Sequence, residues 1–173
     1  MSNAGALRKE AMTTFSFITV WKIAAPVEPV WDAMLRFEDW PSWWKGVESV
    51  EVLARGDANR IGFCSRQIWK SKLPYKLKFE GCIARVEPRS RIEITSKGEL
   101  AGTGLMRFAS DGTQTTFQYD WNVSTTKAWM NIVAPIAKPF FGWNHDVIMN
   151  WGAEGLAKKI GAKKIDTSTK GIF

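Results

Sequence analysis

The sequence predicts an α+β fold: a seven-stranded, curved antiparallel sheet wrapped around a long C-terminal helix, with two short helices after the first strand. Three observations predict it. The region 47–124 alternates between apolar and polar residues and is divided by turn sequences, a short helical pattern follows the first strand, and a long helical pattern comes near the end. Strands in one run with helices at its ends are typical of α+β proteins. The length of 173 residues fits a single domain.

The first strand is expected at 14–23, where β-branched and aromatic residues alternate with others. Pro26 ends this strand. The next apolar residues recur at helical spacing and predict a first short helix; they are Val27, Val30, Trp31, Met34 and Leu35. A second short helix or turn is expected in the Trp-rich segment 38–44.

Six further strands are expected, separated by turns rich in Gly, Pro, Asp and Ser. The clearest of them have one apolar face, as in a sheet that is covered on one side. In the last strand, Phe117, Tyr119 and Trp121 share that face. The six strands lie near 47–54, 60–70, 75–86, 90–97, 100–109 and 113–124.

The C-terminal helical pattern extends over 128–160 and is clean only from about Pro139, because two prolines interrupt it. Gly152 and Gly155 weaken a helix, so they indicate close packing. One apolar stripe contains Phe141, His145, Ile148, Gly152, Leu156 and Ile160. A second stripe contains Trp143, Val147 and Trp151, and the sequence leaves open which of the two faces the sheet.

Both ends of the chain are expected to lie outside the folded domain, which is placed at 13–161. Residues 1–12 look like a disordered segment or a tag remnant, and 162–173 look like a polar tail. Neither a transmembrane span nor a signal peptide is expected. Cys64 and Cys82 fit no redox motif, which indicates two reduced thiols and a cytoplasmic protein.

Charge and composition narrow the classes of partner. The net charge of +7 is compatible with nucleic acid or an anionic membrane, but the basic residues are scattered and accompany no nucleic-acid-binding motif. We therefore expect no nucleic-acid partner. One histidine and two cysteines argue against a metal site, and no cofactor motif is present, so neither a metal nor a cofactor is expected.

The inward faces of the predicted elements are crowded with aromatic residues and carry few polar groups. An apolar concavity with sparse polar groups is typical of a small-molecule pocket, although the same residues would also fill an ordinary core. The residues expected to line the pocket are Trp40, Trp44, Phe63, Ser65, Gln67, Trp69, Phe79, Tyr119, Trp121, Trp129, Phe141, His145 and Met149.

Several weak motifs are spread over 14–161. They are Ile23-Ala24-Ala25-Pro26 followed by Val30-Trp31, the segment Glu38-Asp39-Trp40-Pro41-Ser42-Trp43, the turn Asp111-Gly112-Thr113, and the closing run from His145 to Leu156. With the order of elements, they resemble the START-like, helix-grip (SRPBCC) superfamily, and more narrowly its polyketide cyclase/dehydrase group. The resemblance implies a cavity between the sheet and the C-terminal helix that holds a lipid, sterol, polyketide or other hydrophobic ligand.

Three functions fit this resemblance. The first is binding of a hydrophobic small molecule, the second is catalysis of the cyclase/dehydratase type, and the third is peripheral lipid transfer. His145 is the sharpest catalytic candidate, because a buried imidazole has a lowered pKa and can act as a general base. A hydrogen-bonded core histidine fits the same position. Tyr75 and Tyr119 are candidate donors to a ligand carbonyl, or ordinary core tyrosines.

The apolar segment before the long helix offers a second wall or a portal for the cavity. It contains Trp129, Met130, Ile132, Val133 and Ile136. If the stripe of Trp143, Val147 and Trp151 is exposed, a homodimer contact or transient docking on an anionic membrane would fit it.

Overall fold

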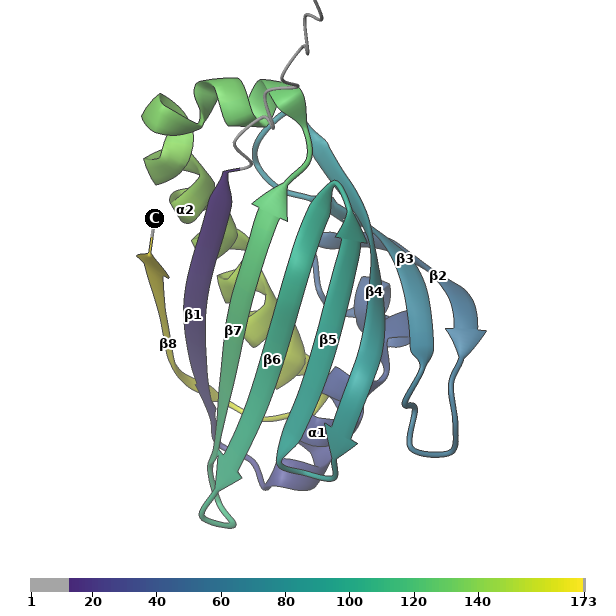
Figure 1. Ribbon diagram of the computed structural model, residues 1–173. Coiled ribbons are helices and arrows are strands. Elements are labelled where there is room, and N and C mark those ends of the chain that lie inside the picture. Colours follow the sequence, from purple (N-terminus) through teal and green to yellow (C-terminus); the bar gives the residue numbers. More distant parts are fainter. Residues whose placement is uncertain (1–12, 173) are drawn as a thin grey trace, which may run out of the picture.

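The computed structural model describes residues 13–172, which form one antiparallel sheet with helices against one of its faces (Figure 1). The helices are α1 (Val27–Leu35), the 3-10 helix η1 (Phe37–Ser42) and α2 (Ala128–Lys159). The strands are β1 (Thr14–Ile23), β2 (Val47–Arg55), β3 (Phe63–Lys70), β4 (Lys76–Glu87), β5 (Arg91–Gly98), β6 (Leu100–Ser110), β7 (Thr115–Thr125) and β8 (Lys164–Ile172).

The strand order is β2-β3-β4-β5-β6-β7-β1-β8. The predicted α+β fold with a curved antiparallel sheet is therefore confirmed, and each of the seven expected strands is present. Consecutive strands from β2 to β7 pair as neighbours, as expected of a meander. The first strand, β1, pairs with β7, and this pairing extends the sheet around α2.

An eighth strand corrects the predicted count of seven. Residues 162–173, expected to be a polar tail, contribute β8, which pairs antiparallel with β1. Its side chains are mostly polar, and the apolar Ile165 is 51% exposed. The segment therefore lacks the alternation of apolar and polar residues from which a strand is predicted. Backbone hydrogen bonds to the free edge of β1 and a contact between the Thr19 and Thr169 hydroxyls (3.2 Å) hold it instead.

The two short helices after β1 are confirmed and close one end of the sheet. In α1, Val30, Trp31 and Met34 are buried on the predicted apolar face. Phe37 and Trp40 of η1 are buried next to them. These side chains form the larger core cluster with the inner face of the sheet and the C-terminal half of α2.

The long helix α2 begins at Ala128, well before the clean pattern at Pro139. Figure 1 shows its first part lying across one end of the sheet before the helix turns and runs down behind the strands. A proline within a helix is a common cause of such a bend, and α2 contains Pro135 and Pro139. Among the described residues, no helix combines the length and apolar character needed to cross a membrane.

The question of which α2 stripe faces the sheet is settled by burial. Phe141 and Leu156 of the first stripe are buried, whereas Trp143 of the second stripe is 46% exposed. The predicted close packing at the glycines is also found, because a methyl group at Gly155 would overlap with the backbone carbonyl of Trp43.

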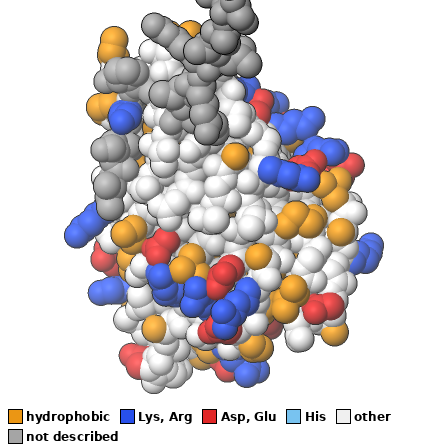
Figure 2. Space-filling model, in the orientation of Figure 1, with side chains coloured by type: hydrophobic (Ala, Val, Ile, Leu, Met, Phe, Trp, Pro, Cys, Tyr) orange, Lys and Arg blue, Asp and Glu red, His pale blue; other side chains and the backbone are white. Residues whose placement is uncertain are grey.

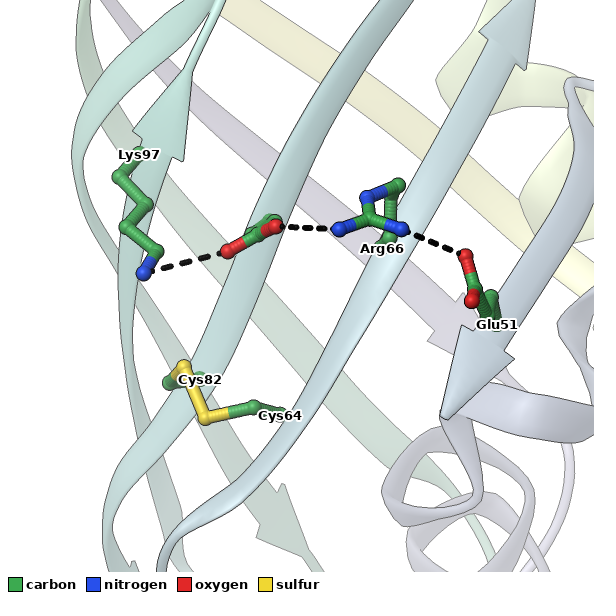
Figure 3. Close-up of polar contacts among 6 residues, drawn as sticks. Glu51, Cys64, Arg66, Cys82 and Lys97 are labelled. Atoms are coloured by element: carbon green, nitrogen blue, oxygen red, sulfur yellow. Dashed lines mark hydrogen bonds and ion pairs between the residues drawn. A yellow bond between two sulfur atoms is a disulfide. The ribbon is translucent and has the colours of Figure 1, made fainter. Parts of the chain in front are cut away.

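The outer face of the sheet carries charged side chains of both signs among uncharged ones (Figure 2). Across β2 to β5, Arg66 pairs with Glu51 and Glu80, and Lys97 pairs with Glu80 (Figure 3). Exposed ion pairs of this kind contribute little to stability. The alternating lysines and glutamates of these strands are thus a solvated face.

The same face corrects the prediction of two reduced thiols. Cys64 and Cys82 are joined by a disulfide between β3 and β4 (Figure 3). Both residues occupy the same rung of the β3–β4 ladder, with their Cα atoms 4.1 Å apart. Spacing alone does not reveal this pairing, because it depends on hairpin register. The argument for a cytoplasmic protein from reduced thiols therefore fails.

Candidate functional site

A cavity of about 120 Å³ lies between the inner face of the sheet and α2 and is open to the surface. Its wall is largely aromatic and aliphatic. The inner faces of β1, β3, β4, β5, β6 and β7 supply one side, and α2 supplies the other. Tyr75, just before β4, packs on Trp129 in the first turn of α2, and Leu77 lies at the start of β4. Because these two lining residues are only half-buried, we infer that the mouth of the cavity lies here.

Most of the residues expected at the pocket come together around this cavity. They are Trp40, Trp44, Gln67, Trp69, Phe79, Tyr119, Trp121, Phe141, His145 and Met149, joined by the catalytic candidate Tyr75. Strand alternation places the residues of β3, β4 and β7, the first stripe of α2 places Phe141 and His145, and Trp40 and Trp44 come from η1 and the segment that follows it. Their role in ligand binding stays a prediction.

Three expected lining residues lie elsewhere. Phe63 is buried in the larger core cluster against Phe37. Ser65 is fully buried behind the wall and accepts a hydrogen bond from Gln67. Trp129 is 42% exposed and packs edge-on against Tyr75 from outside the cavity. Phe63 and Ser65 lie on the inner face of the sheet, as expected from the alternation of β3. This was not sufficient to place them at the cavity, because the core continues beyond the end of the cavity.

Tryptophans close one end of the cavity. The ring of Trp44 lies 5.2 Å from that of Trp40 and 5.1 Å from that of Trp69. The Trp44 indole also donates a hydrogen bond to the carbonyl of Ile148 on α2 (2.9 Å). This bond attaches the aromatic wall to the helix, so the end wall and α2 form one packed unit.

A short polar chain runs along β3 at the cavity wall. The Trp69 indole donates to the Gln67 amide oxygen (2.9 Å), and the Gln67 amide nitrogen donates to the Ser65 hydroxyl (3.1 Å). These bonds satisfy the buried polar groups and fix the Gln67 amide. The polar groups of Ser65 and Gln67 are thus accounted for by contacts within the protein.

Both tyrosines lie where desolvation keeps them protonated. Burial raises the pKa of Tyr75 to about 12, and it raises the pKa of Tyr119 well above its usual range. Both phenols are therefore neutral hydrogen-bond donors at physiological pH. The Tyr119 hydroxyl lies over Gly104, where a methyl group would come within 2.8 Å of it. The glycine makes room for this side chain.

His145 lines the cavity from α2, with its side chain 14% exposed. Its ring stacks on Phe17, with centroids 4.0 Å apart. Burial lowers the pKa of the imidazole, which opposes the effect of the neighbouring Asp146 carboxylate. The Asp146 oxygen lies 4.0 Å from Nδ1, too far for a hydrogen bond, and Nδ1 has no hydrogen-bond partner among the described residues.

Sequence reasoning missed Asn144, which is another unsatisfied polar group of the cavity, besides His145 and the indole nitrogen of Trp40. This side chain is 5% exposed, lines the cavity, and its amide oxygen lacks a hydrogen-bond partner among the described residues. It lies three residues after Phe141 and four before Ile148, so the periodicity of the inner stripe contained the signal. A wider stripe would have included it.

The comparison with protein families decides the classification. Residues 14–167 match the family described as polyketide cyclase/dehydrase and lipid transport. The chain belongs to this family. The resemblance inferred from its weak motifs is thereby confirmed. None of the curated proteins matches the sequence.

Solved structures show that the helix-grip fold is shared at low sequence identity. The Zhui aromatase/cyclase from Streptomyces sp. R1128 is 13% identical over 86% of this chain and 94% of its own, with a TM-score of 0.69. A START superfamily protein from Mycobacterium smegmatis is 14% identical over 84% and 97%, with a TM-score of 0.68. A protein from Thermus thermophilus is 19% identical over 83% and 98%, with a TM-score of 0.64.

Sequence reasoning also missed much of the apolar wall of this polyketide cyclase/dehydrase family member. The additional lining residues are Phe15, Phe17, Phe37, Leu77, Gly81, Ile94, Leu100, Val123 and Ile148, and they are joined by Met130 from the segment expected to form a second wall. Most of them occupy strand positions whose side chains face inward, as the alternation of the sequence indicates. Alternation does not show how far along each strand a cavity extends, so these residues could not be distinguished from core residues.

The lowered pKa of His145 makes stability depend on pH. In the unfolded chain the pKa of the His145 imidazole is near 6.5, which is higher than its pKa in the folded protein. Between these two pKa values the unfolded state therefore binds more protons than the folded state. The His145 contribution to stability is therefore complete above pH 6.5 and is lost as the pH falls toward the folded value. We expect the urea midpoint of the native chain to fall more between pH 7.5 and 5.5 than that of His145→Phe.

His145→Phe keeps the stack on Phe17 and removes only the titration, so every other ionisable group is the same in both proteins. Parallel pH profiles of the two proteins would contradict the buried, neutral state of the imidazole.

Proposed function

We propose that this chain binds a hydrophobic small molecule in the cavity between the sheet and α2. The observation that carries the proposal is the unsatisfied acceptor Asn144 Oδ1 in a largely apolar wall, which also holds the unsatisfied atoms His145 Nδ1 and Trp40 Nε1. A buried acceptor without a partner is unfavourable by about 1–3 kcal/mol. A ligand with a hydroxyl group would satisfy Asn144 while its apolar body fills the cavity.

The size of the cavity indicates which part of the ligand is enclosed. Its volume of about 120 Å³ is close to that of an engineered cavity of roughly 150 Å³ that holds benzene. A single aromatic ring or a short acyl segment therefore fits inside, and a larger ligand would extend through the mouth at Tyr75. Ring-bearing hydroxyl compounds match both the aromatic wall and the acceptor at Asn144.

Calorimetric titration with a matched pair of probes tests this assignment. We expect 2-naphthol to bind more tightly than 2-methoxynaphthalene, because only the naphthol donates a hydrogen bond. Asn144→Leu should weaken naphthol binding about fivefold, which corresponds to one hydrogen bond of about 1 kcal/mol. The affinity for 2-methoxynaphthalene should not change. Asn122→Leu, at an exposed residue of β7, is the control.

Native mass spectrometry of the purified chain supplies a second readout, since a retained hydrophobic compound identifies the natural chemical class. Absence of binding for both naphthalene probes at millimolar concentration, together with a bare chain mass, would refute the proposal.

Catalysis of the cyclase/dehydratase type is the second candidate. It is favoured by a neutral imidazole at the cavity, with a free ring nitrogen that can accept a proton. Tyr75 and Tyr119 would donate to a ligand carbonyl. An enzyme predicts that His145→Phe and Tyr119→Phe lose turnover and keep ligand affinity, whereas for a binding protein these substitutions change affinity alone.

A further inference from the structure

We propose that an exposed apolar face on the first half of α2 docks the protein onto an anionic phospholipid bilayer, next to the mouth of the cavity. This docking face consists of Trp129, Ile132, Val133, Ile136, Phe140 and Trp143. They recur at spacings of three and four residues, so they share one side of the helix. The inference that ligand exchanges through this face rests on the proposed binding function.

The exposure of the docking face sets it apart from the rest of the surface. Ile132 is 78% exposed, Ile136 is 83% and Phe140 is 63%. The other exposed large apolar residues of the described chain, such as Leu53 and Ile165, lie outside α2. In Figure 2, hydrophobic side chains project at the upper left edge, where Figure 1 places α2. A contiguous exposed apolar stripe indicates an interaction surface.

Charge around the docking face favours an anionic surface as the occupant. Residues 128–144 contain no aspartate or glutamate and include Lys138. Lys72 lies in the β3–β4 turn, three residues before Tyr75, whose ring packs on Trp129 at the start of α2. Neither lysine has an ion-pair partner among residues 13–172. A second copy of this face would present the same lysines with no carboxylate from 128–144 to pair with them. Lipid phosphates supply the missing negative charge.

Tryptophans at the two ends of the docking face also fit a bilayer. Trp129 and Trp143 are 42% and 46% exposed, so each ring is half in contact with protein and half free. Tryptophan is enriched at membrane interfaces because its ring is apolar and its indole N–H is polar. The aliphatic and phenyl side chains between them would enter the acyl boundary.

The docking face and the cavity share a wall. Trp129 packs against Tyr75 with ring centroids 5.2 Å apart, and Tyr75 lines the cavity at its mouth. Met130 and Phe141, on the inner side of the same helix, line the cavity directly. Contact of the outer side with a bilayer would thus bring the mouth to the lipid surface, where an apolar ligand enters without crossing water.

Vesicle co-flotation of the full chain tests the proposal. We expect binding to vesicles of three parts phosphatidylcholine and one part phosphatidylglycerol at 50 mM salt, with at least tenfold weaker binding to phosphatidylcholine alone or at 500 mM salt. The double variant Ile132→Ser/Ile136→Ser should lose at least tenfold in vesicle partitioning. Leu53→Ser/Ile165→Ser removes exposed apolar side chains elsewhere and should bind as the native chain does.

Three outcomes would overturn membrane docking. They are absence of flotation with the anionic vesicles, equal losses in both double variants, and a homodimer that Ile132→Ser/Ile136→Ser disrupts while vesicle binding persists. Titration of the native chain with 2-naphthol separates this proposal from the binding function. If the native chain binds 2-naphthol but not the vesicles, docking alone is refuted. If it binds the vesicles but not 2-naphthol, ligand exchange through the face is refuted.

Discussion

Replacing Gly155 by alanine is expected to destabilise the protein by about 3 kcal/mol, the upper end of the usual range for overpacking. The new methyl group would overlap with the backbone carbonyl oxygen of Trp43, and a backbone atom cannot rotate away as a side chain can. Alanine is the better helix former by about 1 kcal/mol, so propensity alone predicts the opposite sign. The overlap with the Trp43 carbonyl therefore outweighs the gain in helix propensity, and the net effect on stability is unfavourable.

Urea unfolding of Gly155→Ala measures this effect, with Lys158→Ala as control. Lys158 is exposed in the same turn of α2, and its substitution should change stability by less than about 0.5 kcal/mol. A Gly155→Ala protein as stable as the native chain would show that α2 does not lie so close to the Trp43 carbonyl.

The same contact positions one end of the cavity. Trp43 precedes Trp44, whose ring closes the cavity and bonds to α2 through Ile148. A methyl group at Gly152 would meet the Trp44 indole, with its Nε1 at 2.7 Å. The two glycines thus let the aromatic wall reach the helix backbone. Close packing was predicted from these glycines, but their partner was not, because it comes from a distant segment.

The features predicted correctly from sequence are those set by local periodicity. Alternation on β7 placed Tyr119 and Trp121 on the inner face, and the stripe on α2 placed Phe141 and His145 opposite them. Such patterns reflect burial, which side-chain chemistry reveals directly. They identify the wall of the cavity better than its ends.

The features that were missed depend on pairing between distant segments. The strand β8 is held by backbone bonds to β1, and its polar side chains carry no period. The Cys64–Cys82 bond depends on the register of β3 against β4. The helical pattern was expected over 128–160 with an interruption at two prolines, but α2 continues through both of them, although the local preference of proline is to end a helix. In each case long-range structure prevails over the local signal.

Reduction of the disulfide is expected to lower the free energy of unfolding by about 3 kcal/mol. Cys64 and Cys82 are 18 residues apart, and closing a loop of about 15 residues restricts the unfolded chain by roughly this amount. The bond links two strands of the cavity wall, since β3 carries Gln67 and Trp69, and β4 carries Phe79. Its loss should therefore destabilise the wall without removing any lining residue.

Urea unfolding with and without dithiothreitol measures this contribution. Both cysteines are half-buried on the outer face of the sheet, so the reductant reaches them without unfolding of the core. The Cys64→Ala/Cys82→Ala variant is the control, and its midpoint should match that of the reduced native chain and not respond to dithiothreitol. An unchanged midpoint after complete reduction, verified by mass, would mean that β-ladder register alone holds β3 on β4. Because the β3–β4 ladder extends from Cys64 to Lys70 on β3, the reduced sheet should remain folded, and 2-naphthol affinity should then survive reduction.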